Sequence, residues 1–110
     1  MSLNKITMMA LAAGLVLPLT ATAAGDPAMG KQKAETCLGC HGIEYYTNVY
    51  PTYAVPKLGG QNGQYIIDAL KGYASGDRGH ATMHAQASSL SDQDIQDIAA
   101  FFESLGGQSQ

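Results

Sequence analysis

The sequence predicts a small all-α domain with three main helices joined by two long connections. Three stretches repeat apolar residues at helical spacing between recognisable cap residues, and no stretch alternates apolar and polar side chains as a half-buried strand does. The chain has 110 residues, which allows one small domain. Its formal net charge of −3, from 6 Lys+Arg and 9 Asp+Glu, provides no basic surface for nucleic acid.

Residues 1–23 are predicted to be a signal peptide that is removed. Lys5 precedes an uncharged apolar run, and the small residues 21–23 match the A-x-A cleavage pattern. An uncleaved anchor is the alternative, because the uncharged stretch 6–24 is just long enough to span a membrane. Cleavage would leave residues 24–110 as a single domain outside the cytoplasm, most simply in a bacterial periplasm, without stable membrane insertion.

The first helix is predicted to begin at Asp26-Pro27, since Asp is a favoured N-cap and Pro is tolerated in the first turn, and to run to about Leu38. The second helix is expected from about Asn62 to Ser75-Gly76. The third opens at Ser91, which forms a capping-box variant with Asp94. Its apolar face is expected to consist of Ile95, Ile98, Ala99, Phe102 and Leu105.

Two connections, 43–60 and 76–90, are predicted to be long ordered loops. The first is rich in tyrosine, and the second carries two histidines and Met83. Loops of this length are uncommon in compact domains unless they are functional. The mature chain also has few large aliphatic residues, so the domain is expected to need a cofactor or cross-link to complete its core.

Residues 37–41, Cys-Leu-Gly-Cys-His, form the C-x-x-C-H signature of c-type haem attachment. Two thiols separated by two residues can each add to one haem vinyl group, and His41 then lies under the iron. Three alternatives compete: a thiol redox pair, which expects a preceding strand; a zinc site, which needs a fourth ligand; and a disulfide, which would stabilise little in so short a loop. A haem would also supply the missing part of the core.

The iron needs a ligand on its other face, and thioether or imidazole groups are suitable. Met83, His80 and His84 are the candidates, and all three lie in the second long connection.

The chain resembles a bacterial class I c-type cytochrome, particularly one single-haem half of the periplasmic dihaem cytochromes c. The resemblance covers nearly all of residues 25–105. It rests on the C-x-x-C-H motif, Gly30, the Pro-X-Leu segment at 56–61, and Met83 placed seven residues before Leu90-Ser91-Asp92. It implies the class I cytochrome c fold, with three main helices and long loops wrapped around one covalently bound haem c.

The resemblance also implies roles for individual residues. Cys37 and Cys40 would form the two thioethers, and His41 and Met83 would be the axial iron ligands. Near the haem, the Pro56 carbonyl would accept a hydrogen bond from the proximal His41, and Leu58 would touch the macrocycle. Gly30 would pack against Phe101 or Phe102. Either His80 or His84 could take the place of Met83 on the iron, and otherwise each is expected to face solvent or bond a haem propionate.

The expected function is that of a periplasmic one-electron carrier, an electron-transfer protein rather than an enzyme, that exchanges electrons with redox protein partners. The main alternative is the haem subunit of a periplasmic oxidoreductase complex, for example with a sulfide-oxidising flavoprotein, in which the tyrosine-rich stretch 45–53 contacts the partner. A haem enzyme or gas sensor with an open iron site is a third class, and it requires Met83 to be off the iron.

Overall fold

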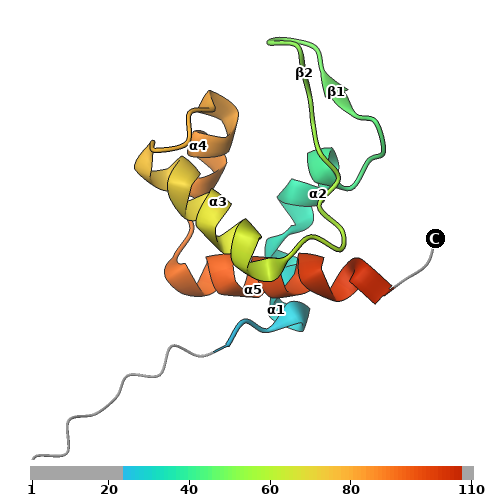
Figure 1. The fold of residues 1–110 in the computed structure, drawn as a ribbon, viewed down its shortest axis with the longest axis vertical. Helices are drawn as coiled ribbons and strands as arrows, with labels where there is room; N and C mark the ends of the chain where they lie inside the picture. Colours follow the sequence, from blue (N-terminus) through green and yellow to red (C-terminus); the bar gives the residue numbers. More distant parts are fainter. Residues whose placement is uncertain (1–23, 108–110) are drawn as a thin grey trace, which may run out of the picture.

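The computed structural model describes residues 24–107, so the predicted signal peptide lies outside the described residues. The described part is mostly helical, as predicted, and Figure 1 shows its arrangement. The helices are α1 (Pro27–Lys33), α2 (Glu35–His41), α3 (Gly63–Ser75), α4 (Ala81–Ala87) and α5 (Asp92–Ser104), followed by a 3₁₀ turn (Leu105–Gly107). A short antiparallel hairpin pairs β1 (Thr47–Asn48) with β2 (Tyr53–Ala54).

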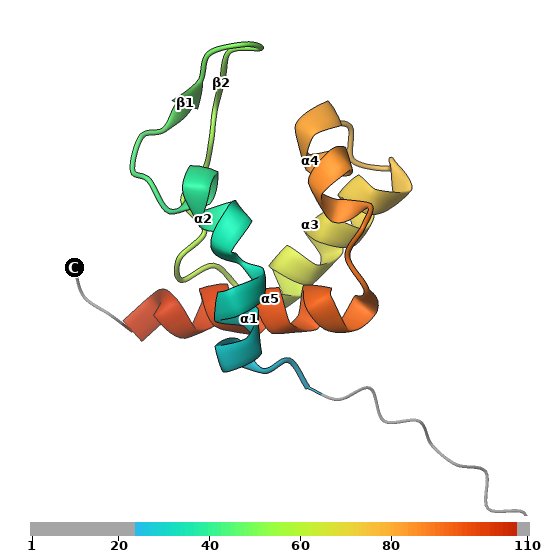
Figure 2. The ribbon, with the colours of Figure 1, turned by 180° about the vertical axis from the view of Figure 1, so that it is seen from behind.

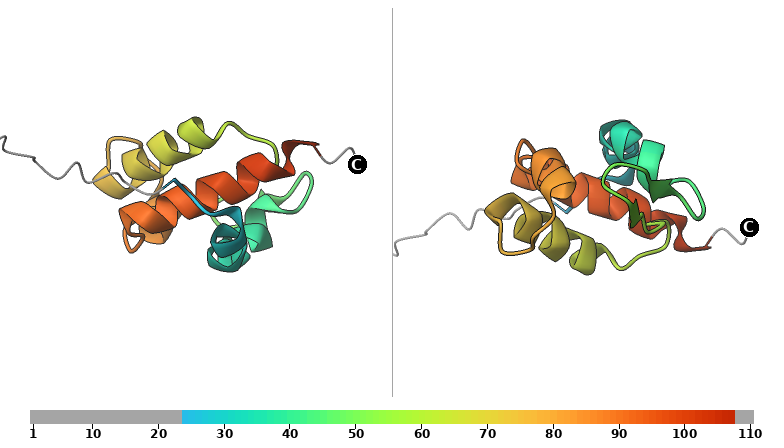
Figure 3. Two further views of the ribbon diagram at one scale, coloured as in Figure 1. Left: turned by 90° about the horizontal axis from the view of Figure 1, so that it is seen from below. Right: turned by 90° about the horizontal axis from the view of Figure 1, so that it is seen from above.

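Helix α5 is the central element of the fold. Figure 3 shows α1 and α2 along one side of α5 and α3 along the other. From this base, α2 and the hairpin rise on one side and α3 and α4 on the other, as Figures 1 and 2 show from opposite directions. The two sides are therefore joined at α5 and separate above it.

The core follows the predicted apolar faces of α3 and α5. Four of the five residues expected on the apolar face of α5 are almost fully buried, and Leu105 packs against the same cluster. These four are Ile95, Ile98, Ala99 and Phe102. Helix α3 adds Ile66, Ile67 and Leu70, and α5 also buries Phe101.

Cap residues fix the helix ends largely where the sequence places them. The Asn62 side chain accepts a hydrogen bond from the backbone N–H of Tyr65 at the start of α3. Gly76 ends that helix with φ 85°, a left-handed conformation that glycine adopts without a Cβ penalty. Ser91 and Asp94 form both bonds of the predicted capping box.

The predicted first helix is divided into two. Ala34 ends α1 with φ −88° and ψ 3°, and α2 begins at the next residue. Hydrogen bonds of helical spacing continue on both sides, from Ala34 N–H to the Gly30 carbonyl and from Leu38 N–H to the Ala34 carbonyl. The chain therefore bends at Ala34, between α1 and α2. Ala34 itself is fully buried, so the bend does not expose this residue. Helix α2 then continues to His41, and the complete C-x-x-C-H motif lies on it.

Gly30 permits the close approach of α1 to α5. A Cβ at this position would overlap the backbone carbonyl oxygen of Asp97 and lie 2.8 Å from the Cβ of Phe101. The predicted packing of Gly30 on an aromatic residue of the last helix is confirmed, and the partner is Phe101.

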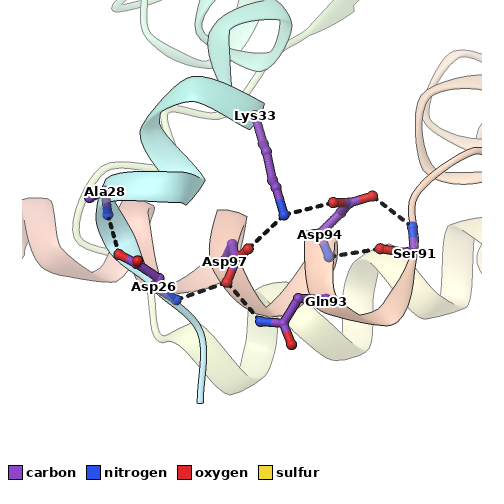
Figure 4. A network of polar contacts seen from close by, with 7 residues as sticks. All are labelled: Asp26, Ala28, Lys33, Ser91, Gln93, Asp94 and Asp97. Carbon is purple, nitrogen blue, oxygen red and sulfur yellow. Dashed lines mark hydrogen bonds and ion pairs between the residues drawn. The ribbon is translucent and has the colours of Figure 1, made fainter. Parts of the chain in front are cut away.

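A polar network joins the same two helices, and Figure 4 shows its members. The Asp97 carboxylate is buried, with 4% side-chain exposure, and it lies 2.6 Å from Lys33 Nζ. It also accepts hydrogen bonds from the backbone N–H of Asp26 at 2.8 Å and from the Gln93 amide at 2.9 Å. Lys33 makes a second ion pair with Asp94 at 2.8 Å. The one buried charged residue among residues 24–107 is therefore fully partnered.

Both predicted loops contain regular structure that the sequence pattern did not indicate. In the first, the β1–β2 pair is only two residues long on each strand, too short to show alternation. In the second, residues 81–87 form α4, so the prediction of an irregular connection was wrong there. Helix α4 buries a single residue, Ala87, which explains why no apolar periodicity marks it.

Candidate functional site

A cavity of about 390 Å³ lies between the two sides of the fold, with α5 beneath it. Its lining comes from α2, the hairpin, α3, α4 and α5. Apolar side chains on its wall include Leu58, Ile66, Leu70, Met83, Ile98 and Phe102. The volume is in the usual range for a ligand or cofactor pocket.

The two cysteines and the histidine of the C-x-x-C-H motif line this cavity together. Cys37 is partly buried and Cys40 is exposed, and both are free thiols. Burial raises the pKa of the Cys37 thiol. A raised pKa disfavours the thiolate that a catalytic thiol redox pair requires.

A zinc site, a redox motif within a βαβ unit and a disulfide all lack support in residues 24–107. No group of three His, Cys, Asp or Glu side chains converges there as ligands of zinc do. The two described strands follow the motif in the sequence and pair with each other, so they form no βαβ unit before it. The cysteines are not joined as a disulfide.

His41 has a fixed orientation. Its Nδ1 lies 2.7 Å from the Pro56 carbonyl oxygen. A carbonyl only accepts, so Nδ1 must carry the proton, which leaves Nε2 of the neutral ring with a free lone pair. The contact that the resemblance implies for Pro56 is thus present. Leu58, which donates its backbone N–H to the His41 carbonyl at 3.3 Å, also lines the cavity.

Met83 reaches the cavity from α4, on the other side from His41. His80 also lines it, but its Nδ1 accepts a hydrogen bond from the backbone N–H of Met83 and its ring packs against Tyr53 and Tyr73. His80 is half-buried, so it does not simply face solvent, and the alternative that it bonds a haem propionate stays a prediction. His84 is exposed, outside the cavity lining, and bonds the Tyr73 carbonyl.

Two residues of the cavity wall, Tyr73 and Arg78, were not predicted from the sequence to be site residues. Tyr53, from the tyrosine-rich stretch 45–53, also lines the cavity. The Arg78 guanidinium lies 4.8 Å from the centre of the Tyr73 ring, and it donates to the Tyr65 hydroxyl at 3.2 Å. The hydrogen bond to Tyr65 is the main cause of a raised Arg78 pKa. Both contacts link α3 to the residues just after it, and no motif in the sequence indicated that these residues face a cavity.

The family model "Cytochrome c" matches residues 27–106, which is most of the described chain. The chain belongs to the cytochrome c family. It is 42% identical over 84 residues to cytochrome c-554(548) of Halomonas halodenitrificans, a match that covers 74% of this chain and 98% of that protein. It is 39% identical over 104 residues to cytochrome c4 of Pseudomonas aeruginosa, covering 93% of this chain and 49% of that protein.

Structure supports the same assignment. The crystal structure of reduced cytochrome c4 from Pseudomonas stutzeri matches with a TM-score of 0.54 and 27% identity, over 77% of this chain and 52% of that one. The predicted class I cytochrome c fold is therefore confirmed. The chain spans about half the length of these cytochrome c4 relatives, consistent with one single-haem half of a dihaem protein.

Membership of this family implies a covalently bound haem c, and the cavity suits such a group. A haem is a flat apolar macrocycle that carries two carboxylates. The cavity wall is largely apolar, and its charged residues are Lys57 and Arg78, both positive. No acidic side chain lines it to repel the carboxylates.

Among residues 24–107, no helix is both long enough and apolar enough to cross a membrane.

Proposed function

We propose that this cytochrome is a periplasmic one-electron carrier with a His/Met-ligated haem c. In this proposal Cys37 and Cys40 form the thioethers, and His41 and Met83 are the axial ligands. Residues 1–23 direct export and are then removed. The bound haem supplies one-electron chemistry between Fe(II) and Fe(III), and the residues of the chain set where and how easily that exchange occurs.

The observation that carries the proposal is the hydrogen bond between His41 Nδ1 and the Pro56 carbonyl. It holds the proton on Nδ1, so that the other ring nitrogen, Nε2, keeps a free lone pair for ligation. Proline has no N–H and a fixed φ, so residue 56 makes no competing donor bond. From the same segment, partly buried Leu58 packs against the core.

Met83 favours a carrier over an open catalytic site. Its side chain is partly buried, packs against the core and lines the cavity on the other side from His41. A thioether on the second axial position would leave no site for O₂ or a substrate, and it would favour Fe(II) relative to a second imidazole. Exchange of single electrons with redox protein partners is the chemistry that remains.

Exposed parts of the attachment site support transient contact with those partners. Cys40 is exposed, which places one thioether position at the molecular surface. Electron-transfer encounters of this kind use small, weak interfaces below about 1,200 Å². A permanent subunit of an oxidoreductase would instead co-purify with its partner.

Met83→Ala in the holoprotein tests the proposal. We expect the ferric protein to lose the weak long-wavelength charge-transfer band of thioether-ligated haem. The ferrous protein should bind CO rapidly, and the reduction potential should fall. His84→Ala, on the same helix but outside the cavity lining, is the matched control and should leave all three unchanged. An unaltered spectrum in Met83→Ala would exclude Met83 as the ligand.

Size-exclusion chromatography of the native protein separates a monomeric carrier from a subunit of a larger complex.

A further inference from the structure

The hairpin and the start of α4 meet through three side chains at the mouth of the cavity. The Tyr53 hydroxyl donates to the Thr82 hydroxyl oxygen at 3.1 Å. The Tyr53 and His80 rings pack edge to face, with centroids 4.7 Å apart and an interplanar angle of 83°. We call Tyr53, His80 and Thr82 the clamp. All three line the cavity, and none belongs to the C-x-x-C-H motif or its ligands.

His80 is also the N-cap of α4. Its backbone is extended, with φ −167° and ψ 109°, and its Nδ1 accepts the backbone N–H of Met83 at 3.3 Å. An imidazole is an unusual N-cap, because short oxygen-bearing side chains are preferred at that position. Helix α4 has seven residues, too few to be stable without tertiary contacts and caps. The cap bond therefore acts on the backbone of the proposed ligand itself.

We propose that the clamp positions Met83 for axial ligation, an inference that rests on the proposed function of Met83. His80 fixes the backbone of Met83, and Tyr53 and Thr82 hold the first turn of α4 against β2. Tyr53 lies three residues before Pro56, whose carbonyl orients His41. The short segment 53–56 thus contacts both ligand-bearing segments: Pro56 orients His41 directly, and Tyr53 acts on Met83 through the clamp. Loosening the clamp raises the fraction of molecules in which Met83 is off the iron.

Two substitutions of His80 separate its cap from its ring. His80→Asn keeps an N-cap acceptor for the Met83 N–H and loses the ring that packs on Tyr53. His80→Phe keeps an aromatic ring and loses the acceptor. Loss of an N-cap corresponds to about a fivefold change in a local equilibrium. We expect CO to bind ferrous His80→Phe holoprotein about fivefold faster than wild type, with a weaker charge-transfer band in the ferric form, and His80→Asn to stay close to wild type.

The hydroxyl pair is tested without changing ring packing or shape. Tyr53→Phe and Thr82→Val each remove one partner of the hydrogen bond. Each should accelerate CO binding roughly twofold to tenfold, the range for loss of one hydrogen bond. Because both act through the same bond, the double variant should equal the single variants rather than multiply them. Tyr50→Phe, at a hairpin residue that is 92% exposed, is the matched control and should bind CO at the wild-type rate.

The outcomes distinguish a failure of the clamp proposal from a failure of the proposed ligation by Met83. Wild-type CO kinetics in His80→Phe, together with fast CO binding in Met83→Ala, would overturn the clamp and retain Met83 ligation. Equal acceleration of CO binding in His80→Asn and His80→Phe would also overturn the clamp, because keeping the N-cap acceptor would then give no protection to Met83 ligation. Slow CO binding in Met83→Ala itself would instead contradict the proposed function. Unfolding in guanidinium is measured in parallel, so that a general loss of stability is recognised.

Discussion

Helix α1 meets α5 through close backbone packing and a partly buried ion pair, whereas the hairpin meets α4 through side-chain contacts at the cavity wall. In the first region every buried polar side-chain atom has a hydrogen-bond partner, and the buried apolar residues pack against one another. In the second region apolar side chains face a cavity of about 390 Å³. Side chains alone therefore fill the core of the first region, whereas the second region needs the haem to fill its cavity.

The largest expected effect comes from removing the haem. Cys37→Ser combined with Cys40→Ser should abolish covalent attachment and leave a largely unfolded chain, because a domain this small cannot keep an empty cavity of this size. Haem staining after denaturing electrophoresis and thermal unfolding by circular dichroism measure the two effects. Thr36→Ser, beside the motif, is the control and should retain both haem and transition. A wild-type-like cooperative transition in the double variant would show that the α1–α5 region alone sustains the fold.

The second prediction breaks the region that is complete without haem. Gly30→Ala would place a Cβ against the Asp97 carbonyl and 2.8 Å from the Phe101 Cβ. We expect the free energy of unfolding of the holoprotein to fall by about 3 kcal/mol, the upper part of the range for overpacking. Guanidinium unfolding measures it.

Gly72→Ala is the matched control for that prediction. It changes a helical glycine of α3 whose Cβ would meet Arg78 Cβ at an ordinary 3.4 Å. It should stabilise the protein by about 0.5 to 1 kcal/mol, since alanine is the better helix former. Equal effects of the two substitutions would contradict a close α1–α5 contact at Gly30.

The same two regions differ in how far the sequence predicts them. Helices α3 and α5 lie at the predicted positions because strong caps such as Asn62 and Ser91 and long apolar faces are local signals. The C-x-x-C-H motif is equally local. The hairpin and α4 were missed because two-residue strands and a helix burying only Ala87 carry no periodic pattern.

The residues of the site likewise differ in how far the sequence predicts them. The motif alone predicted Cys37, Cys40 and His41, and ligand chemistry offered Met83, His80 and His84. The resemblance to a family then favoured Met83 and added Pro56 and Leu58. The contact between His80 and Tyr53 joins residues far apart in the chain, so no local spacing indicates it. The cap that His80 makes for the Met83 N–H is local, but histidine is not among the residues preferred at an N-cap, so the sequence did not indicate it either.

The smallest effect is confined to acid pH and concerns the α1–α5 region. The Asp97 pKa falls from 3.8 to about 2, chiefly because its carboxylate accepts the Asp26 N–H and then because of Lys33. The Asp94 pKa also falls to about 2, mainly through Lys33. A carboxyl whose pKa is lower in the folded state stabilises that state above its unfolded pKa, and this contribution is lost as the pH falls toward the folded pKa. We therefore expect the free energy of unfolding to be level above about pH 5 and to decline between about pH 4 and pH 2.

Asp97→Asn tests whether the buried carboxylate causes that decline. The variant should be less stable than wild type at neutral pH, because Lys33 loses one of its two carboxylate partners, the one at 2.6 Å. It should also lose stability less steeply between about pH 4 and pH 2, since one of the two carboxyls that take up a proton is gone. Asp92→Asn removes one negative charge from the same helix at a side chain that is 87% exposed, and it should keep the wild-type slope. If Asp97→Asn kept that slope as well, the buried carboxylate would not be a cause of the decline, which would then have to come from other carboxyls such as Asp94.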